Sequence, residues 1–489
     1  MGYIQGVDRH QVSMFPESLD DYVAADSAVR VIDEFVWGLD MDAHGFRRAS
    51  PATEGRPGYD PRALLALYIY GYLNRTRSSR KLEAEAHRNV ELIWLMRQLR
   101  PDHKTIAEFR RVHPKPLKKV TRSFLMLCQE LELLGEALVL IDGTKLRAGN
   151  SLDRNYTAAR TAKLIKQIEA SVARYLSDLD WQDQKERRLG GSTDPELPRK
   201  LEALRARQKE LEAILAQIDE TGEQVSLTDP DSRRMKSRGT VEVCYNAQIA
   251  VDSKHALIVA HEVTNAENDM AQLAPMALAA REALGVEGLE VAADAGYFSN
   301  TQVALCEAEG ITAYVPEPQT SNNAKIGRFT KREFRYDESR DAYLCPAGQW
   351  LERRSQKKTR DGRILGNYLN PAACRDCPVR MQCTRDQYAR RITRRPEEAQ
   401  VLAMRERLAR RTELMKLRKA MVEHPFGTLK RGMDMGYFLL RGLERVGGEF
   451  SLSVLAYNLK RVMNILGVEC LLEALRSPRK RAEGGLMPA

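Results

Sequence analysis

The sequence has no apolar run long enough to cross a membrane. Its longest apolar stretch, residues 63–70, is far shorter than the roughly 20 residues that a transmembrane helix needs. It also opens without the basic, apolar and small-residue segments of a secretory leader. We therefore expect a cytoplasmic protein with no membrane partner. Because disulfides are rare in that compartment, any cluster among the 8 cysteines favours metal binding over disulfides.

Acidic residues are outnumbered by basic ones, and the net charge is +10. The excess is concentrated in residues 100–122, with eight basic and two acidic residues, and in residues 385–419, with twelve and five. Such segments suit the phosphates of a nucleic acid, although a solvated helix face has the same composition. Charge alone leaves both interpretations open.

One strand pattern ends in an acidic residue and a glycine. The apolar residues 137–141 lead into Asp142 and Gly143, and the similar stretch 289–293 leads into Asp294. A single aspartate after a strand is more often a turn residue than a ligand. Two such carboxylates at the strand ends of one α/β sheet could hold a divalent cation through oxygen ligands. Asp269 precedes a predicted helix, and we interpret it as a helix cap.

The order of the patterns predicts an α/β fold with a mixed sheet, divided into six segments. Residues 1–135 are expected to form a helical domain, in which 102–111 resembles the second helix of a helix-turn-helix with its basic residues exposed. We expect parts of a sheet in 136–157 and 224–320, a helical hairpin in 158–223, a cysteine-rich segment in 321–400 and helices in 401–489.

Four cysteines gather in the otherwise polar and aperiodic segment 321–400. Cys374 and Cys377 form a C-x-x-C pair, Cys383 follows six residues later, and Cys345 lies upstream beside a proline and a glycine. Four thiolates at such spacing suit a structural Zn²⁺. Uncoordinated thiols are the alternative.

The last segment contains a third acid among cations. On a helix, Lys419, Glu423, Phe426 and Lys430 fall near one face. Pro425 predicts a kink or a helix start at this point. A solvated amphipathic helix is the simpler interpretation of the pattern.

In their order along the chain, these motifs resemble the DDE transposases of bacterial insertion sequences, in the branch with a helical N-terminal domain and a cysteine-rich segment before the glutamate. The resemblance covers most of the chain and rests on Asp142-Gly-Thr, Tyr245-Asn-Ala-Gln248, Asp294-Ala-Gly-Tyr297 and Glu423-His-Pro-Phe-Gly-Thr-Leu-Lys430. It implies an RNase H-like core with an all-α N-terminal domain and a helical-hairpin insertion. It also implies that Asp142, Asp294 and Glu423 are the catalytic residues.

The resemblance implies metal-dependent cleavage of DNA and strand transfer, with Mg²⁺ or Mn²⁺ bound by the three carboxylates. The partners would be double-stranded transposon ends and target DNA, with a homodimer in the DNA complex and a location at the bacterial nucleoid. We expect DNA contacts from Lys104, Arg110 and Arg111, and from Lys416, Lys419 and Lys430. Lys416 and Lys419 stand where related branches have Tyr and Arg, so the two-pronged phosphate contact of arginine is absent at those positions.

Two other functions fit the same residues. One is a zinc-dependent DNA-binding regulator in which the acids are structural, and the other is a metal-dependent nuclease without joining activity. Metal-dependent strand cleavage separates the first from a transposase, and joining of a 3′ end to a target separates the second.

Overall fold

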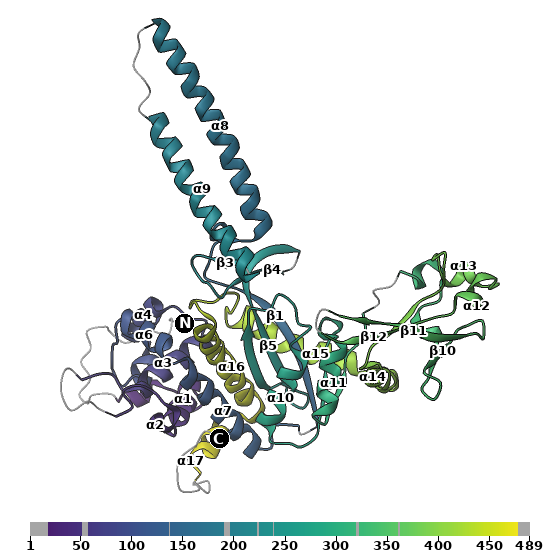
Figure 1. Ribbon diagram of the computed structural model, residues 1–489. Helices are drawn as coiled ribbons and strands as arrows, with labels where there is room; N and C mark the ends of the chain where they lie inside the picture. The colour runs from purple at the N-terminus through teal and green to yellow at the C-terminus, as the bar shows by residue number, and fades with distance from the viewer. Residues whose placement is uncertain are drawn as a thin grey trace, which may run out of the picture.

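The computed structural model describes residues 18–50, 57–135, 137–189, 196–222, 224–237, 239–318, 322–359 and 362–477. Helices and a mixed sheet combine in one molecule, from which a long helical hairpin and a small second sheet project (Figure 1). The predicted α/β class is therefore confirmed. Within the described ranges, no helix has both the length and the apolar character needed to span a membrane.

Before the first strand, the described residues form only helices and their connections. The elements are η1 (Leu19–Tyr22), α1 (Ala28–Trp37), α2 (Met41–His44), α3 (Pro61–Leu73), α4 (Ser79–Arg88), α5 (Val90–Leu95), α6 (His103–Val112) and α7 (Pro114–Glu130). Side chains of Asp60 and Asp102 accept hydrogen bonds from the first-turn N–H groups of α3 and α6, which fixes where these helices begin. Helix α3 is buried on nearly all sides and forms the centre of this group.

The main sheet contains β1 (Leu138–Arg147), β4 (Arg233–Ser237), β5 (Thr240–Asp252), β6 (Ile258–Thr264), β7 (Leu289–Ala292) and β8 (Ile311–Tyr314). The strand order is β4-β5-β1-β7-β8, and β6 also pairs with β5. Strand β1 is antiparallel to β5 and parallel to β7, which is parallel to β8. Helices α10 (Leu273–Leu284) and α11 (Asn300–Ala308) connect the later strands.

Strand β1 continues past the residue at which we expected it to end. It pairs with β5 as far as Arg147, whereas its pairing with β7 stops at Leu140. Asp142 is therefore inside a strand and not at a turn, because the antiparallel neighbour supplies hydrogen bonds beyond the point where the parallel neighbour ends. This corrects the sequence-based boundary.

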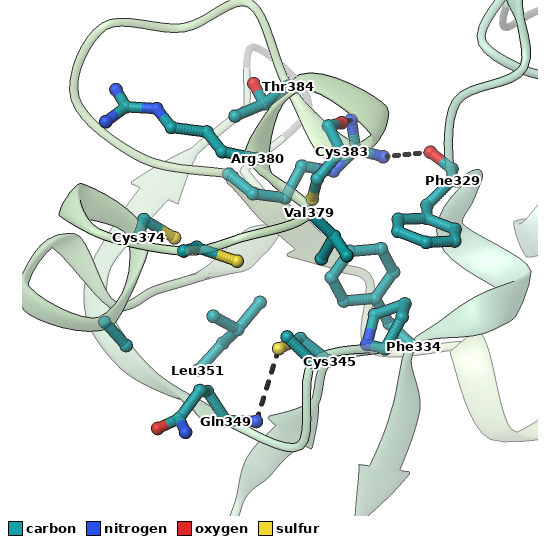
Figure 2. Close-up of a pocket in the computed structure, with 15 residues that line it drawn as sticks. Phe329, Phe334, Cys345, Gln349, Leu351, Cys374, Val379, Arg380, Cys383 and Thr384 are labelled. Carbon is teal, nitrogen blue, oxygen red and sulfur yellow. Dashed lines mark hydrogen bonds between the residues drawn. The ribbon is translucent and has the colours of Figure 1, made fainter.

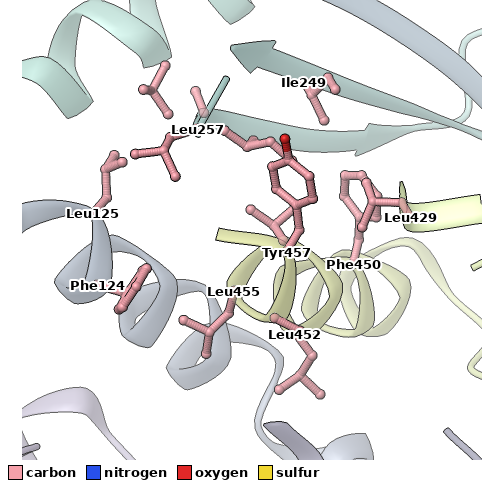
Figure 3. Close-up of a cluster of buried hydrophobic side chains, with 14 of the residues drawn as sticks. Phe124, Leu125, Ile249, Leu257, Leu429, Phe450, Leu452, Leu455 and Tyr457 are labelled. Carbon is pink, nitrogen blue, oxygen red and sulfur yellow. The ribbon is translucent and has the colours of Figure 1, made fainter. Parts of the chain in front are cut away.

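The C-terminal helices are α14 (Glu398–Arg410), α15 (Leu414–Gly427), the π-helical turn η6 (Thr428–Gly432), α16 (Leu443–Leu466) and α17 (Val468–Arg476). Helix α16 packs between the N-terminal helices and the sheet. Figure 3 shows its residues Phe450, Leu455 and Tyr457 in one buried cluster with Phe124 of α7 and Leu257 beside the sheet. The N-terminal helices thus share one hydrophobic core with the sheet.

Between β1 and β4, the chain forms a helical hairpin of α8 (Ala158–Leu189) and α9 (Glu196–Thr221). The turn η2 (Leu152–Arg154) and the short strands β2 (Asn155–Tyr156) and β3 (Val225–Ser226) lie at its base, and the helices extend away from the sheet (Figure 1). A separate cluster of Tyr156, Ile165 and Leu211, with Ile214 and Ile218, is buried near this base. From the sequence we expected a loop over residues 190–198 between these helices. Its last three residues belong to α9, which begins at Glu196, and residues 190–195 lie outside the described part of the chain.

A second sheet occupies the segment that looked aperiodic in the sequence. It contains β9 (Arg335–Asp337), β10 (Ala342–Leu344), β11 (Trp350–Lys358), β12 (Ile364–Leu369) and β13 (Ile392–Arg394), all antiparallel, in the order β13-β12-β11-β10-β9. Among the described residues, its cluster of buried apolar side chains consists of Phe334, Tyr343, Leu351, Tyr368 and Ile392. Strands β9, β10 and β13 have three residues each, and β11 is exposed over most of its length, so these strands carry little alternation of apolar and polar residues. The short helices η4 (Ala324–Ile326), η5 (Lys331–Glu333), α12 (Pro371–Arg375) and α13 (Arg380–Cys383) flank this sheet.

Candidate functional site

Asp142 lies in β1, and Asp294 lies close to it, just after the neighbouring strand β7. The parallel pairing of β1 with β7 places Leu140 opposite Ala292, and each aspartate follows two residues later. Asp294 begins the turn η3 (Ala295–Tyr297), and its Oδ1 accepts a hydrogen bond from the N–H of Gly296 at 2.8 Å. The two carboxylates that the sequence predicted to meet are therefore brought to one edge of the sheet.

An arginine from helix α15 contacts both carboxylates. Arg418 Nη2 lies 2.7 Å from Asp142 Oδ1 and 3.8 Å from Asp294 Oδ2. Its Nε and Nη2 also donate hydrogen bonds to the carbonyl oxygen of Ile141 at 3.2 and 2.9 Å. The Arg418 side chain is 9% exposed, compared with 20% for the Asp142 side chain and 50% for that of Asp294.

Arg418 was not among the site residues predicted from the sequence, although its place on a helix face of otherwise apolar residues pointed to it. Leu414, Arg418, Val422 and Pro425 fall on one face of α15, and all four are buried against the sheet. An arginine on an otherwise apolar helix face indicates a buried acidic partner. Burial raises the pKa of Asp142 above its usual range, and Arg418 and the Gly143 N–H oppose this rise.

A buried polar network lies beneath Gly143. Gln248 pairs with Gly143 across β1 and β5, and its amide oxygen accepts a hydrogen bond from the Tyr297 hydroxyl. Asp269 accepts hydrogen bonds from Asn246 and from Gln248, each at 2.7 Å. This corrects the prediction that Asp269 is a helix cap. Helix α10 begins only at Leu273, and the Asp269 side chain instead accepts hydrogen bonds from two residues of β5.

The close packing of this network requires a glycine after Asp142. A methyl group at Gly143 would overlap Gln248 Nε2 and lie 2.9 Å from Tyr297 Oη and 3.0 Å from Asp269 Oδ1. Gln248 and Tyr297, which the sequence motifs contain, are thus buried, hydrogen-bonded to each other and packed against Gly143.

Glu423 lies on the same helix as Arg418, five residues further along. Its side chain is 64% exposed, and its Oε1 lies 3.9 Å from Lys419 Nζ. Lys430, from the π-helical turn, donates a hydrogen bond to Thr144 of β1 and lies over the ring of Phe426. Helix α15 therefore runs beside β1, with Arg418 near Asp142 and Lys430 near Thr144.

The oxygen ligands of Asp142 and Asp294 have the chemistry that Mg²⁺ or Mn²⁺ prefers. The arrangement of the three carboxylates is not that of a metal-bound site, because Arg418 forms an ion pair with Asp142 Oδ1 and Glu423 pairs with Lys419. Over the described part of the chain, no three side chains of His, Cys, Asp or Glu are gathered closely enough to hold a metal ion.

The four clustered cysteines line one cavity of the small-sheet region. Figure 2 shows the sulfur atoms of Cys345, Cys374 and Cys383 around a common space, and Cys377 lines the same cavity. All four are free thiols. The N–H of Gln349 donates a hydrogen bond to the Cys345 sulfur at 3.3 Å. In the described residues these thiols are adjacent but not drawn together into a metal-binding set.

Burial is the main cause that raises the pKa of the Cys383 thiol above its usual value. Arg390 opposes this rise, whereas nearby Cys374, Cys345 and Cys377 add to it. The Cys383 thiol therefore resists ionisation unless a cation is bound nearby.

One predicted DNA-binding residue is not available to DNA. Arg110 is only 4% exposed, donates hydrogen bonds to the Tyr72 hydroxyl and the Arg77 carbonyl oxygen, and lies 3.9 Å from Glu449. The prediction that the basic residues of this helix are exposed is therefore wrong for Arg110. It turns inward because α16 supplies a buried carboxylate on that side.

The other predicted basic residues lie at the surface or beside the site. Lys104 and Arg111 of α6 are exposed, and Arg111 pairs with Glu108 at 2.5 Å. Lys416 and Lys419 are 78% and 73% exposed on α15. These side chains remain accessible to an anionic partner.

Comparison with protein families yields two matches. Residues 344–463 match the model described as Transposase DDE domain, and residues 17–112 match the model described as Transposase domain (DUF772). No curated protein and no solved structure matches the chain. The first match includes Glu423 and the cysteine cluster, whereas both aspartates lie outside the two matched ranges.

Both matched models describe transposases, so the chain is a transposase, a class of enzyme that acts on DNA. Within this class, the two matches together indicate a DDE-type transposase of the insertion-sequence type. The family predicted from the motifs is therefore confirmed.

Proposed function

We propose that this transposase binds the terminal repeats of its element and uses Asp142, Asp294 and Glu423 to cut DNA and join the 3′ ends to a target. The main support is the placement of Asp142 in β1 and of Asp294 just after the adjacent strand β7, beside the helix that carries Glu423. A sheet with β1 antiparallel to β5 and parallel to β7 and β8 supports an RNase H-like core. The two other candidate functions fit the family matches less well, because each lacks strand transfer.

The three carboxylates would hold Mg²⁺ or Mn²⁺ together with the DNA. When bound, such ions activate the attacking oxygen and stabilise the leaving oxygen of a phosphodiester. Other residues of the chain orient the aspartates and supply positive charge for the DNA. Gln248 and Tyr297, bonded to each other, pack against Gly143 and so restrict the chain next to Asp142. Lys419 places positive charge beside Glu423, and Lys430 places it beside Thr144 and Phe426, for the DNA backbone.

The first test replaces each carboxylate separately. Asp142→Ala, Asp294→Ala and Glu423→Ala should retain binding to a terminal-repeat duplex and lose nicking in Mg²⁺. Glu413→Ala is the matched control, because Glu413 lies immediately before α15 and its side chain is 76% exposed. An Asp142→Ala protein that still nicks a terminal repeat would contradict the assignment. Nicking by the wild type without joining of the 3′ end to a target would indicate a nuclease.

We also propose that Cys345, Cys374, Cys377 and Cys383 bind a structural Zn²⁺. Their free thiols line one cavity, and a five-residue core is small for a separate sheet. Zinc would draw the sulfurs together and relieve the unfavourable charge of neighbouring thiolates. Elemental analysis should find one zinc per chain, and its absence after purification without chelator would contradict this proposal.

DNA contacts are proposed for Lys104 and Arg111 of the N-terminal helices and for Lys416, Lys419 and Lys430 near Glu423. End binding would then belong to the helices of 1–135. The catalytic core would consist of 136–157 and 224–320, with the hairpin 158–223 inserted between them. The zinc segment would be 321–400, and the helices that carry the glutamate would be in 401–489. We propose a homodimer that brings two ends together, in the cytoplasm at the nucleoid. The mass of the complex on a terminal-repeat duplex tests the dimer.

A further inference from the structure

The most unusual feature of the site is a cation supplied by the protein itself. Arg418 contacts both Asp142 and Asp294 and is fixed in place by two hydrogen bonds to the carbonyl oxygen of Ile141. Arginine side chains usually keep their charged end in water. The Arg418 side chain is only 9% exposed, so its charge has little access to water. Its position between the carboxylates is one in which a bound cation would also be stabilised.

We propose that Arg418 is a resident counter-ion that competes with a divalent cation for the Asp142–Asp294 pair and must leave the pair when the cation binds. This inference rests on the proposed function of the two aspartates as metal ligands. Arg418 would then be a positioning residue that sets the metal affinity of the DNA-free protein.

The charges support competition. Two carboxylates with one guanidinium group retain a single net negative charge, whereas a divalent cation would neutralise both. A guanidinium group and a divalent cation on the same oxygen repel each other strongly, because this part of the site is shielded from water. Asp142 Oδ1, at 2.7 Å from Arg418, is therefore the atom over which the two cations compete.

The helix that carries Arg418 also carries the acid that the site lacks. Glu423 is five residues further along α15, which is about 7.5 Å along the axis and about 140° around it. Pro425 lies within this helix, and the π-helical turn Thr428–Gly432 follows it. Proline and π-helical turns interrupt the regular hydrogen bonds of a helix, so α15 has points at which it can change its direction. A small movement of α15 could withdraw Arg418 while Glu423 approaches the aspartates.

The test measures binding of Mn²⁺ to the full-length chain without DNA, by electron paramagnetic resonance of the free ion. Arg418→Met keeps the length and apolar character of the buried stem and removes the charge. We expect its dissociation constant for Mn²⁺ to be about 10- to 100-fold lower than that of the wild type, the range set by loss of one charged hydrogen bond. An equal or higher dissociation constant would overturn the inference.

Arg411→Met is the matched control. Arg411 lies just before α15, and its Nη1 binds Glu290 of β7 at 2.5 Å. Its replacement removes the same charge near the same sheet without contact to Asp142, so its Mn²⁺ affinity should stay within about twofold of the wild type, since distant surface charge is screened by salt. A gain equal to that of Arg418→Met would show a general charge effect and contradict competition at the site.

Asp142→Asn separates this inference from the proposed function. Added to Arg418→Met, it should abolish the tighter binding. If neither the wild type nor Arg418→Met binds Mn²⁺ in a manner that depends on Asp142, the metal-ligand assignment itself fails. If the wild type binds through Asp142 and Arg418→Met binds no more tightly, only the competition fails.

A second measurement uses the wild type and does not depend on how the variant folds. Phenylglyoxal modifies accessible arginines, and peptide mass spectrometry reports each site. Saturating Mn²⁺ should increase modification of Arg418, and the increase should be absent in Asp142→Asn. Unchanged modification of Arg418 with Mn²⁺ bound through Asp142 would also refute its displacement.

Discussion

Glu449 holds the N-terminal and C-terminal parts of this transposase together, and its replacement gives a direct test of the fold. The carboxylate is fully buried in α16, lies 3.3 Å from Arg77 Nη1 and 3.9 Å from Arg110 Nη1, and accepts hydrogen bonds from the N–H groups of Leu439 and Leu440. The arginine side chains are 3% and 5% exposed. Glu449→Gln keeps the shape of the side chain and removes its charge. Two buried guanidinium groups would then have no compensating carboxylate.

The expected loss follows from the burial of these charges. Removing one partner of a buried ion pair costs about 3–5 kcal/mol, because the remaining charge stays away from water. Two arginines share Glu449, so we expect Glu449→Gln to lower the free energy of unfolding by at least about 3 kcal/mol. The exposed pair of Glu108 and Arg111, with side chains 53% and 47% exposed, should contribute less than about 1 kcal/mol.

Urea unfolding of the wild type, Glu449→Gln and Glu108→Gln, followed by circular dichroism, would measure these differences. The reasoning would be refuted if Glu449→Gln lost less than about 1 kcal/mol, the range of a surface pair. A further variant in which methionine replaces both Arg77 and Arg110 should reduce the cost of Glu449→Gln, since the uncompensated cations are then gone. An unchanged cost in that background would show that the loss has another source.

Three further predictions concern the site, the cysteine cluster and DNA binding. Gly143→Ala should lower stability by about 1–3 kcal/mol through the overlap with Gln248 and should reduce nicking, and wild-type values in urea unfolding and a nicking assay would contradict the packing argument. Cys377→Ser should lose bound zinc, and the thermal unfolding temperature of the wild type should fall with a zinc chelator but stay constant in this variant. Replacing Lys104 and Arg111 together by alanine should reduce the slope of log K against log salt on terminal repeats by about 1.8, and an unchanged slope would exclude them as phosphate contacts.

Several parts of the fold and the site could be predicted from local sequence. The buried strand before Asp142, the short strand before Asp294 and the paired helices between them follow from apolar periodicity. The adjacency of the two aspartates also follows, since each comes directly after the apolar run of a strand in one α/β sheet. The second sheet could not be predicted in this way, because its short, exposed strands are held by neighbours and not by a continuous apolar face.

The sequence by itself determined the family, the α/β class and the identity of the acidic and cysteine residues that we propose as ligands. Only the tertiary structure decided that Asp142 lies inside a strand, that Arg418 binds it, and that Arg110 is turned away from solvent. The physical reason is that periodicity shows which side chains share a face of a helix or strand but not which distant element covers that face. The partners of Arg110 and Asp142 come from α16 and α15, hundreds of residues further along the chain.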